Sequence, residues 1–209
     1  MKKTADIYNR VMPKDNIAVI TFLENKVTGS RLIVANVHIF WDPQFKDVKL
    51  VQVAMLMEEL TRWADIWAKS FPNKSRTSPS DASTPPPAVH YASGSHIPLL
   101  ICGDFNSVAD SGVYELLSRG NLASDHDDLA GRTYGNFTAH GMSHPFSLKS
   151  SYSNIGELKF TNYTPGFTGV IDYIWYTMSN LTVTGLMGDV DMSYLARVPG
   201  FPNMHFPSE

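Results

Sequence analysis

The sequence has little of three features that would restrict its class: cysteine, long apolar runs and an apolar leader. Its 209 residues include a single cysteine, Cys102, which excludes an internal disulfide and favours a reducing compartment. The longest apolar runs, at residues 32–35 and 97–102, are far too short to cross a bilayer. The first six residues contain no apolar segment of the kind that directs secretion. With 43% hydrophobic and 18% charged residues, the composition is typical of one soluble globular domain.

An excess of positive charge is also absent, because the formal net charge is −3. A protein that binds nucleic acid through its own basic surface is usually more basic. A nuclease that uses bound divalent metals is not excluded, because the metal ions supply local positive charge. Phosphate-binding glycine loops, zinc-type cysteine pairs and the His-Glu-x-x-His pattern are missing as well.

Hydrophobic periodicity predicts a mixed α/β organisation. Residues 17–22 and 32–38 are typical of two strands of an antiparallel hairpin. Residues 47–69 carry apolar side chains at helical spacing and predict one long amphipathic helix. Residues 70–96 lose all periodicity and are rich in serine and proline, which predicts a disordered surface insertion.

The second half of the chain carries fewer periodic segments. A cap at Asp110 or Ser111 predicts a short helix that ends near Gly120. Residues 170–176 and 181–186 are typical of strands.

The most informative motif is Gly-Asp-Phe-Asn at residues 103–106, directly after the apolar strand 99–102. In extended backbone, Asp104 and Asn106 point to the same side of the strand. A carboxylate can orient or deprotonate a water molecule, and an amide can donate to a developing negative oxygen. The alternative is that both side chains only form turns after the strand.

Two further polar residues lie at strand ends or inside strands. His38 ends the second predicted strand and could donate to a phosphate oxygen, although a structural histidine is an equal alternative. Asp172 lies between apolar and aromatic residues, where an unpaired carboxylate is costly, so we expect it to have a partner. Pro43, in Trp-Asp-Pro at residues 41–43, is by itself typical of a turn.

The loop at residues 160–167 holds several aromatic side chains. Phe167 could stack on a nucleobase, which contributes about 1–3 kcal/mol. Taken alone, an aromatic residue that anchors the loop is the more frequent case.

Together, these motifs resemble the endonuclease/exonuclease/phosphatase superfamily. They occur in its order, at residues 36–38 (Asn-Val-His), 41–43 (Trp-Asp-Pro), 103–106 and 171–173 (Ile-Asp-Tyr). Residues 8–16, 156–162 and 200–203 resemble more closely the carbon-catabolite-repressor type of poly(A) deadenylase, the nuclease subunit of the NOT complex. The Phe-Thr-Asn-x-Thr-Pro loop followed by Ile-Asp-Tyr-Ile-Trp is the most specific of these likenesses.

The resemblance implies a fold, a chemistry and a substrate. The fold is an α/β sandwich of two sheets flanked by helices, the deoxyribonuclease-like four-layer fold, with residues 1–209 as an incomplete domain. The chemistry is a two-metal phosphodiesterase that uses Mg²⁺ as a 3′-5′ exoribonuclease on poly(A), releasing AMP. The implied partners are poly(A) RNA and subunits of the NOT complex, and no membrane association is implied. The implied location is the cytoplasm and the nucleus.

The resemblance also implies roles for individual residues. Asp104 would orient the attacking water and lie at the metal site, and Asn106 and His38 would contact the scissile phosphate. Asp172 would align a catalytic histidine. Pro43 and Phe167 would enclose an adenine, with Asn162 nearby.

Parts of the family pattern have no counterpart in these 209 residues: an early metal-binding glutamate, a final catalytic histidine and the leucine-rich-repeat domain that docks to the NOT subunits. We therefore expect a truncated chain that is inactive by itself. Two alternatives stay open: a phosphatase or nuclease of the same fold with another substrate, and a non-catalytic pseudonuclease or assembly module.

Overall fold

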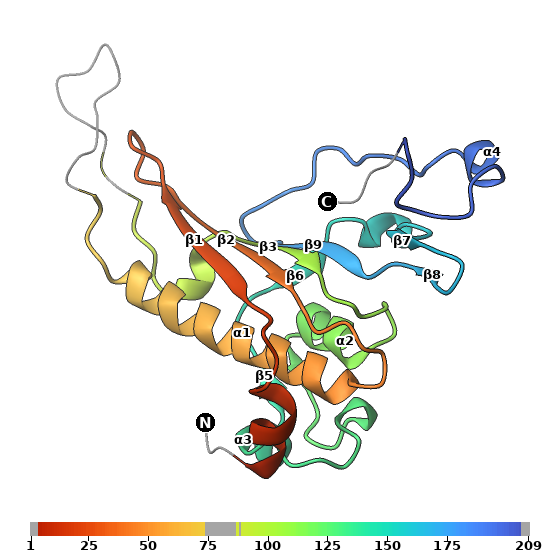
Figure 1. Cartoon of the computed structure of the whole chain (residues 1–209). Coiled ribbons are helices and arrows are strands. Elements are labelled where there is room, and N and C mark those ends of the chain that lie inside the picture. The colour runs from red at the N-terminus through yellow and green to blue at the C-terminus, as the bar shows by residue number, and fades with distance from the viewer. Residues whose placement is uncertain (1–3, 74–86, 88, 206–209) are drawn as a thin grey trace.

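The computed structural model describes residues 4–73, 87 and 89–205 and is organised around one five-stranded sheet (Figure 1). The strand order is β1-β2-β3-β9-β6, and the β2–β3 pair is parallel whereas the other pairs are antiparallel. The strands are β1 (Ala18–Glu24), β2 (Arg31–His38), β3 (Leu99–Asp104), β6 (Leu148–Ser150) and β9 (Asp172–Thr177). The predicted hairpin and the α/β class are confirmed.

Two longer helices accompany the sheet. They are α1 (Lys46–Ala68) and α2 (Gly112–Arg119). The remaining helical turns are η1 (Ile7–Val11), η2 (Gly94–His96), η3 (Asp127–Leu129), α3 (Asn136–His140), η4 (Ser153–Ile155) and α4 (Met192–Leu195). Two pairs of short strands complete the description: β4 (Asn121–Leu122) with β5 (Met142–Ser143), and β7 (Asn162–Tyr163) with β8 (Thr168–Gly169). None of the described helices has the length and hydropathy needed to cross a membrane.

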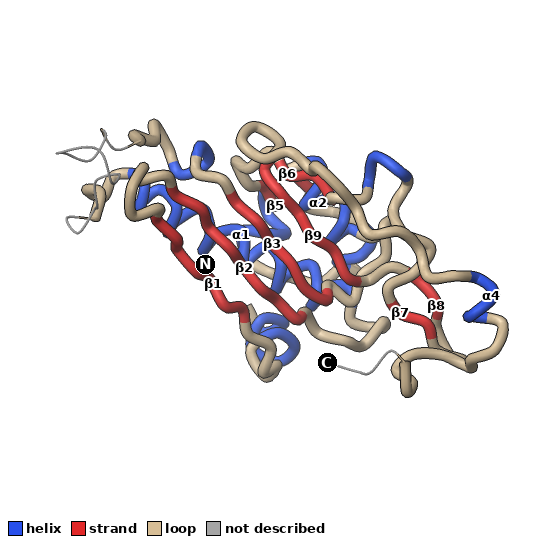
Figure 2. Tube along the Cα trace, turned by 90° about the horizontal axis from the view of Figure 1, so that it is seen from above, coloured by secondary structure: helices blue, strands red, loops and turns tan. Residues whose placement is uncertain are grey.

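The two faces of the sheet differ in what covers them. Ile33, Ala35 and Ile101 are fully buried with α1 on one face. Alternate residues of the same strands, among them His38 and Asp104, therefore lie on the other face. Seen from above, the strands lie in front of the helices (Figure 2). The described residues thus form one large sheet of the two that the resemblance implies.

The predictions for the two main helices are confirmed. The start of α1 is buried on all sides, over residues 47–51, and from residue 53 onward the buried residues recur at the spacing expected for one packed face. At α2, the Ser111 hydroxyl accepts a hydrogen bond from the backbone N–H of Tyr114 at 3.3 Å. Gly120 ends α2 in the left-handed conformation, at a φ of 76°.

The strand predicted at residues 181–186 is wrong. This segment has no regular secondary structure and is mostly exposed. No described strand pairs with it, so its backbone lacks the ladder of hydrogen bonds that makes a β-strand.

The predicted insertion at residues 70–96 is only partly described, since residues 74–86 and 88 lie outside the described part. Its end packs on the domain. The backbone N–H of Gly94 donates to Asp65 of α1 at 2.7 Å, and that of Arg31 donates to the Tyr91 hydroxyl at 2.8 Å. A Cβ on Gly94 would lie 2.5 Å from the backbone of Ala64, so helix and chain meet too closely for a side chain. The segment from Tyr91 to His96 is therefore part of the packed domain.

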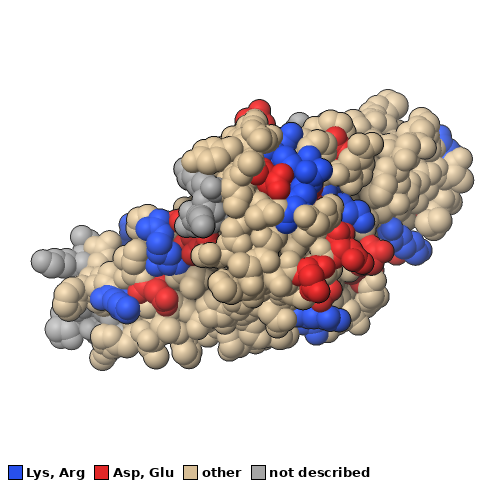
Figure 3. Space-filling view, turned by 90° about the horizontal axis from the view of Figure 1, so that it is seen from below, with Lys and Arg blue, Asp and Glu red and all other residues tan. Residues whose placement is uncertain are grey.

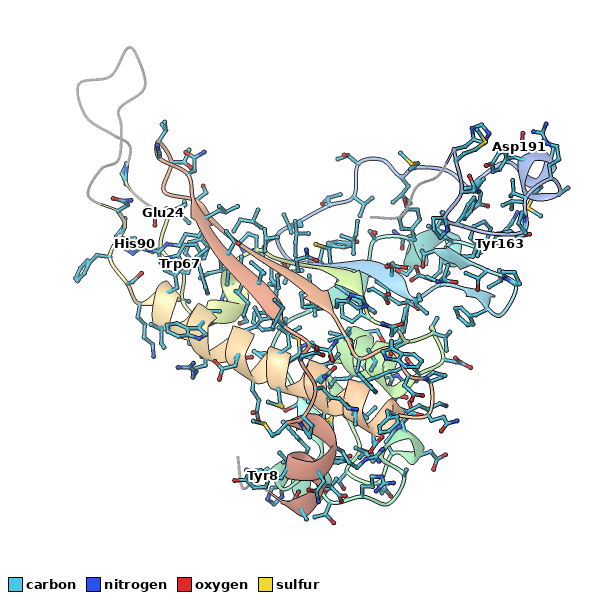
Figure 4. All side chains as sticks on the ribbon, in the orientation of Figure 1. Tyr8, Glu24, Trp67, His90, Tyr163 and Asp191 are labelled. Atoms are coloured by element: carbon cyan, nitrogen blue, oxygen red, sulfur yellow. The ribbon has the colours of Figure 1, made fainter. Side chains whose placement is uncertain are left out.

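A buried arginine joins the far end of α1 to the sheet. The Arg31 side chain, 3% exposed, pairs with Glu24 at 2.9 Å and donates to the carbonyls of Trp67 and Ser70. Glu24 and Trp67 lie close together at this end (Figure 4). Arg31 therefore adds a charged donor to the carbonyls at the end of α1, where no further helical turn supplies one.

Candidate active site

Three polar side chains from three neighbouring strands lie in one row across the sheet. His38 ends β2 and is the register partner of Asp104, which ends β3. Asp104 is in turn the partner of Asp172, which begins β9. The His38 Nε2 lies 3.7 Å from Asp104 Oδ2. The strand order therefore brings together three predicted residues that are up to 134 positions apart in the sequence.

The row opens into a cleft with a volume of about 890 Å³. His38, Asp104 and Asp172 line it, together with Asn36 and Asn162. A concave site with convergent polar groups is the usual form of a catalytic or binding site.

Asp104 is held in an environment that disfavours its charge. Burial raises the pKa of the Asp104 carboxyl, and the nearby Asp172 carboxylate raises it further. The backbone N–H of Asn106, which donates to Asp104 Oδ1 at 2.7 Å, acts in the opposite direction. A cation beside these two carboxylates would relieve both costs.

Asp172 has a hydrogen-bond partner, as its apolar surroundings predict. The Thr161 hydroxyl donates to Asp172 Oδ2 at 2.6 Å. The same hydroxyl oxygen accepts the backbone N–H groups of Ile171 and Asp172 at 3.1 Å each. Thr161 thus orients Asp172, which the motif analysis did not anticipate.

The geometry of Asn106 differs from the one that its spacing predicted. Its φ is 47°, so the backbone is left-handed and the argument from extended backbone fails after Asp104. The Asn106 Nδ2 donates to the carbonyl of Ile39 at 2.9 Å. Asp104 and Asn106 therefore do form the turn contacts of the alternative reading, and the phosphate contact of Asn106 stays a prediction.

Gly103 explains why the motif begins with glycine. It has a φ of 140°, and a Cβ at this position would lie 1.9 Å from the carbonyl oxygen of Val37. Only glycine lets β2 approach β3 this closely. The approach occurs one residue before the His38–Asp104 pair.

The three residues predicted to bind the base lie in different surroundings. Pro43 is exposed in the turn before α1, and Phe167 is 42% exposed in the turn between β7 and β8. Neither is among the residues that line the cleft, so their joint enclosure of a base stays a prediction. Asn162 does line it, and its buried Oδ1 has no hydrogen-bond partner among the described residues.

The sequence of residues 30–186 matches the profile of the endonuclease/exonuclease/phosphatase family. The chain belongs to this family. The site row fits within the matched span, since all four predicted catalytic residues fall inside it.

The family relatives include fungal proteins named CCR4-Not complex 3′-5′-exoribonuclease subunit Ccr4. The one from Phaeosphaeria nodorum is 55% identical over 222 aligned residues, which cover 100% of this chain and 37% of that protein. The one from Coccidioides immitis is 58% identical and is matched over 98% of this chain and 29% of its own length. The chain therefore spans about a third of these relatives.

A solved family structure shows the same fold. The crystal structure of ANGEL2, described as a 2′,3′-cyclic phosphatase, superposes with a TM-score of 0.54 and 22% identity. The match covers 80% of this chain and 51% of that one. At this identity the likeness extends to the fold alone.

The residues of the row fit part of a coordination shell for a hard divalent cation. Mg²⁺ is usually held by one or two carboxylates, with water and substrate phosphate as the other ligands. Asp104 and Asp172 supply two carboxylates at the cleft, in a place where burial and mutual repulsion favour a cation. Within residues 4–73, 87 and 89–205, no cluster of three or more His, Cys, Asp or Glu side chains is arranged to hold a metal.

Two residues of α1 that support the site were missed by the sequence analysis. Lys49 is buried, and its Nζ donates to the carbonyl of Asn106 at 2.6 Å. Gln52 Oε1 accepts the backbone N–H of Phe40 at 2.9 Å, just after β2. The available signal was a lysine inside the apolar run Val48–Val51, where a polar residue without a function is costly.

Proposed function

We propose that this chain supplies part of the active site of a metal-dependent phosphodiesterase, a 3′-5′ exoribonuclease that shortens poly(A) RNA and releases AMP. The observation that carries the proposal is the row of His38, Asp104 and Asp172 in a cleft, in a chain that is 55% identical over its whole length to a protein named as such an exoribonuclease.

The side chains of the row can each perform a defined step. The Asp104 carboxylate would hold the metal and orient a water molecule toward phosphorus. His38, whose side chain is 71% exposed, would donate a hydrogen bond to an oxygen of the scissile phosphate. Asp172, oriented by Thr161, would align a catalytic histidine. When bound, Mg²⁺ supplies the positive charge that stabilises the entering and leaving oxygens.

The preference for adenine would come from residues around the cleft. Asn162 lines the cleft, and its side-chain amide is of the type that can bond to a base edge. Phe167 and Pro43 would add the faces against which the base packs. Membership of a CCR4-Not assembly belongs to the same proposal and rests on the names of the relatives. A place in the cytoplasm and the nucleus is proposed with it, from the family resemblance alone.

On the helix-covered side, the described residues carry charges of both signs (Figure 3). Basic and acidic side chains lie beside one another on this face rather than in a single basic area (Figure 3). RNA binding is therefore assigned to the cleft, with the metal as the source of positive charge.

The test compares binding of fluorescent A₂₀ and C₂₀ RNA to the whole chain with Mg²⁺. We expect tighter binding of A₂₀, weakened by Phe167→Ala, and loss of metal dependence in Asp104→Asn. Equal affinity for both RNAs, or a metal dependence that survives in Asp104→Asn, would overturn the proposal.

Activity is measured in the same samples as AMP release. We expect no release from the chain by itself, because the described carboxylates form only part of a metal site. Release that depends on Mg²⁺ and on Asp104 would correct that expectation and support the assigned chemistry.

A further inference from the structure

Lys49 is a buried charge that the proposed chemistry does not use. It lies near the start of α1, is 5% exposed, and is flanked by the fully buried Val48, Leu50 and Val51. Burial lowers the pKa of its ammonium, which shows that the site opposes the charge. A lysine in such a place is retained against a desolvation cost, so its contacts merit a functional explanation.

The contact of Lys49 is at the centre of the predicted catalytic loop. Its Nζ donates to the carbonyl oxygen of Asn106 at 2.6 Å. Hydrogen bonds from charged donors are about twice as strong as neutral ones. This carbonyl belongs to Asn106, whose φ of 47° is a left-handed conformation that costs free energy for residues other than glycine. The ammonium therefore offsets the strain at this position.

Asn106 is consequently held at three points. Its carbonyl accepts from Lys49, its Nδ2 donates to Ile39, and its backbone N–H donates to Asp104 Oδ1. The last bond directs one oxygen of Asp104 toward the loop and leaves Oδ2 on the side of His38. A change at Lys49 is thus transmitted through one residue to the carboxylate.

We propose that Lys49 is a positioning residue that fixes the Asp104 carboxylate for metal binding by holding the Asn106 carbonyl. This inference rests on the proposed function to the extent that Asp104 is the metal ligand. It adds a specific link between α1 and the site. One turn later on the same helix, Gln52 holds the chain after β2 in the same manner, so α1 supports both loops that end the central strands.

The test uses the whole chain with three substitutions. Lys49→Met removes the charge and the donor while keeping the length of the side chain. Lys49→Arg keeps a charged donor. Lys46→Met is the matched control, because it removes the same charge one turn earlier from a side chain that is 66% exposed and forms an ion pair with Asp128 at 3.5 Å.

Two readouts are measured for each variant: the Mn²⁺ affinity by titration calorimetry and the hydrogen exchange rate of the Asn106 amide by NMR. We expect Lys49→Met to weaken Mn²⁺ binding by about 10- to 100-fold, the usual effect of losing a residue that orients a metal ligand. The Asn106 amide should exchange faster. Lys49→Arg should recover part of both properties, and Lys46→Met should match the original chain.

Thermal unfolding separates positioning from stability. Lys49→Met leaves the part-buried Asn106 carbonyl without its charged donor, so its unfolding midpoint should fall, and Mn²⁺ affinity is measured well below that midpoint, where the variant is folded. If Lys49→Met does not fold, Lys49→Gln, which keeps a neutral donor on a shorter side chain, replaces it and should lose part of the affinity.

The proposal would be overturned by Mn²⁺ affinity that is unchanged in Lys49→Met, by equal losses in Lys46→Met, or by an unprotected Asn106 amide in the original chain. A chain that binds no Mn²⁺ contradicts the proposed metal site instead. In that case the exchange of the Asn106 amide still decides whether Lys49 holds the loop.

Discussion

Replacing Gly103 with alanine should destabilise the sheet at the point where the site is assembled. The added Cβ would lie 1.9 Å from the carbonyl oxygen of Val37, whereas real contacts of this kind stay above 3.0 Å. Strands β2 and β3 would therefore have to separate by about 1 Å, which breaks hydrogen bonds that depend on their spacing. One bond at risk joins the N–H of Ile39 to the carbonyl of Asp104 at 2.9 Å.

The cost has two parts that can be estimated. A φ of 140° is a glycine conformation, and the strain of placing alanine there is about 1–3 kcal/mol. Loss of one or two backbone hydrogen bonds adds about 0.5–1.5 kcal/mol each. Together they amount to about 2–6 kcal/mol, a large fraction of the stability of about 5–15 kcal/mol that is usual for a domain.

The assay is urea unfolding followed by circular dichroism, with two matched controls. Gly156→Ala introduces a side chain at a φ of 85° with no neighbour within 4 Å, so it measures conformational strain alone. Gly166→Ala has neither a positive φ nor a close neighbour and should change stability by less than about 1 kcal/mol. A loss in Gly103→Ala no larger than that in Gly156→Ala would refute the argument from close strand approach.

Two further predictions concern buried polar groups outside the site. Arg31→Met should cost about 3–5 kcal/mol in urea unfolding, because it removes the buried charged donor that Glu24 and the carbonyls at the end of α1 share. Arg62→Met breaks an exposed pair on α1 and should cost less than about 1 kcal/mol. Equal costs would contradict the capping role of Arg31. His144 is buried, and burial lowers its pKa below the ordinary value of 6.5, so the unfolded chain binds more protons as the pH falls through that value. The free energy of unfolding should therefore decrease below pH 6.5, by at most about 1.4 kcal/mol per pH unit from this group. His144→Gln should show a smaller dependence of this free energy on pH. An equal dependence would contradict the lowered pKa of His144.

Local patterns were sufficient for the elements whose signals lie within one segment. The hairpin of β1 and β2, the length of α1 and both caps of α2 follow from spacing and from residues such as Ser111 and Gly120. The strand expected at residues 181–186 failed for the opposite reason. A strand needs a neighbour, and no local pattern states which neighbour is present.

The site was predictable as a set of residues but not as an arrangement. Asp104, His38 and Asp172 were recognised from motifs, and the structure brings them into one row through the order β2-β3-β9. The left-handed Asn106 and the buried Lys49 were not foreseen. Both depend on contacts between α1 and the loop after β3, which are 57 residues apart in the sequence.

The sequence by itself determined the class of the fold, the main elements and the chemistry of the side chains available to the site, because these follow from periodicity, capping and residue type. Only the tertiary structure decided which of those side chains meet, and at what distance. The physical reason is that strand pairing and helix packing join segments that are distant in the sequence. They can do so only where the space allows it, as at Gly103, where a Cβ would meet β2. They also bury polar groups, whose desolvation cost is offset by hydrogen bonds such as the one from Lys49 to the Asn106 carbonyl.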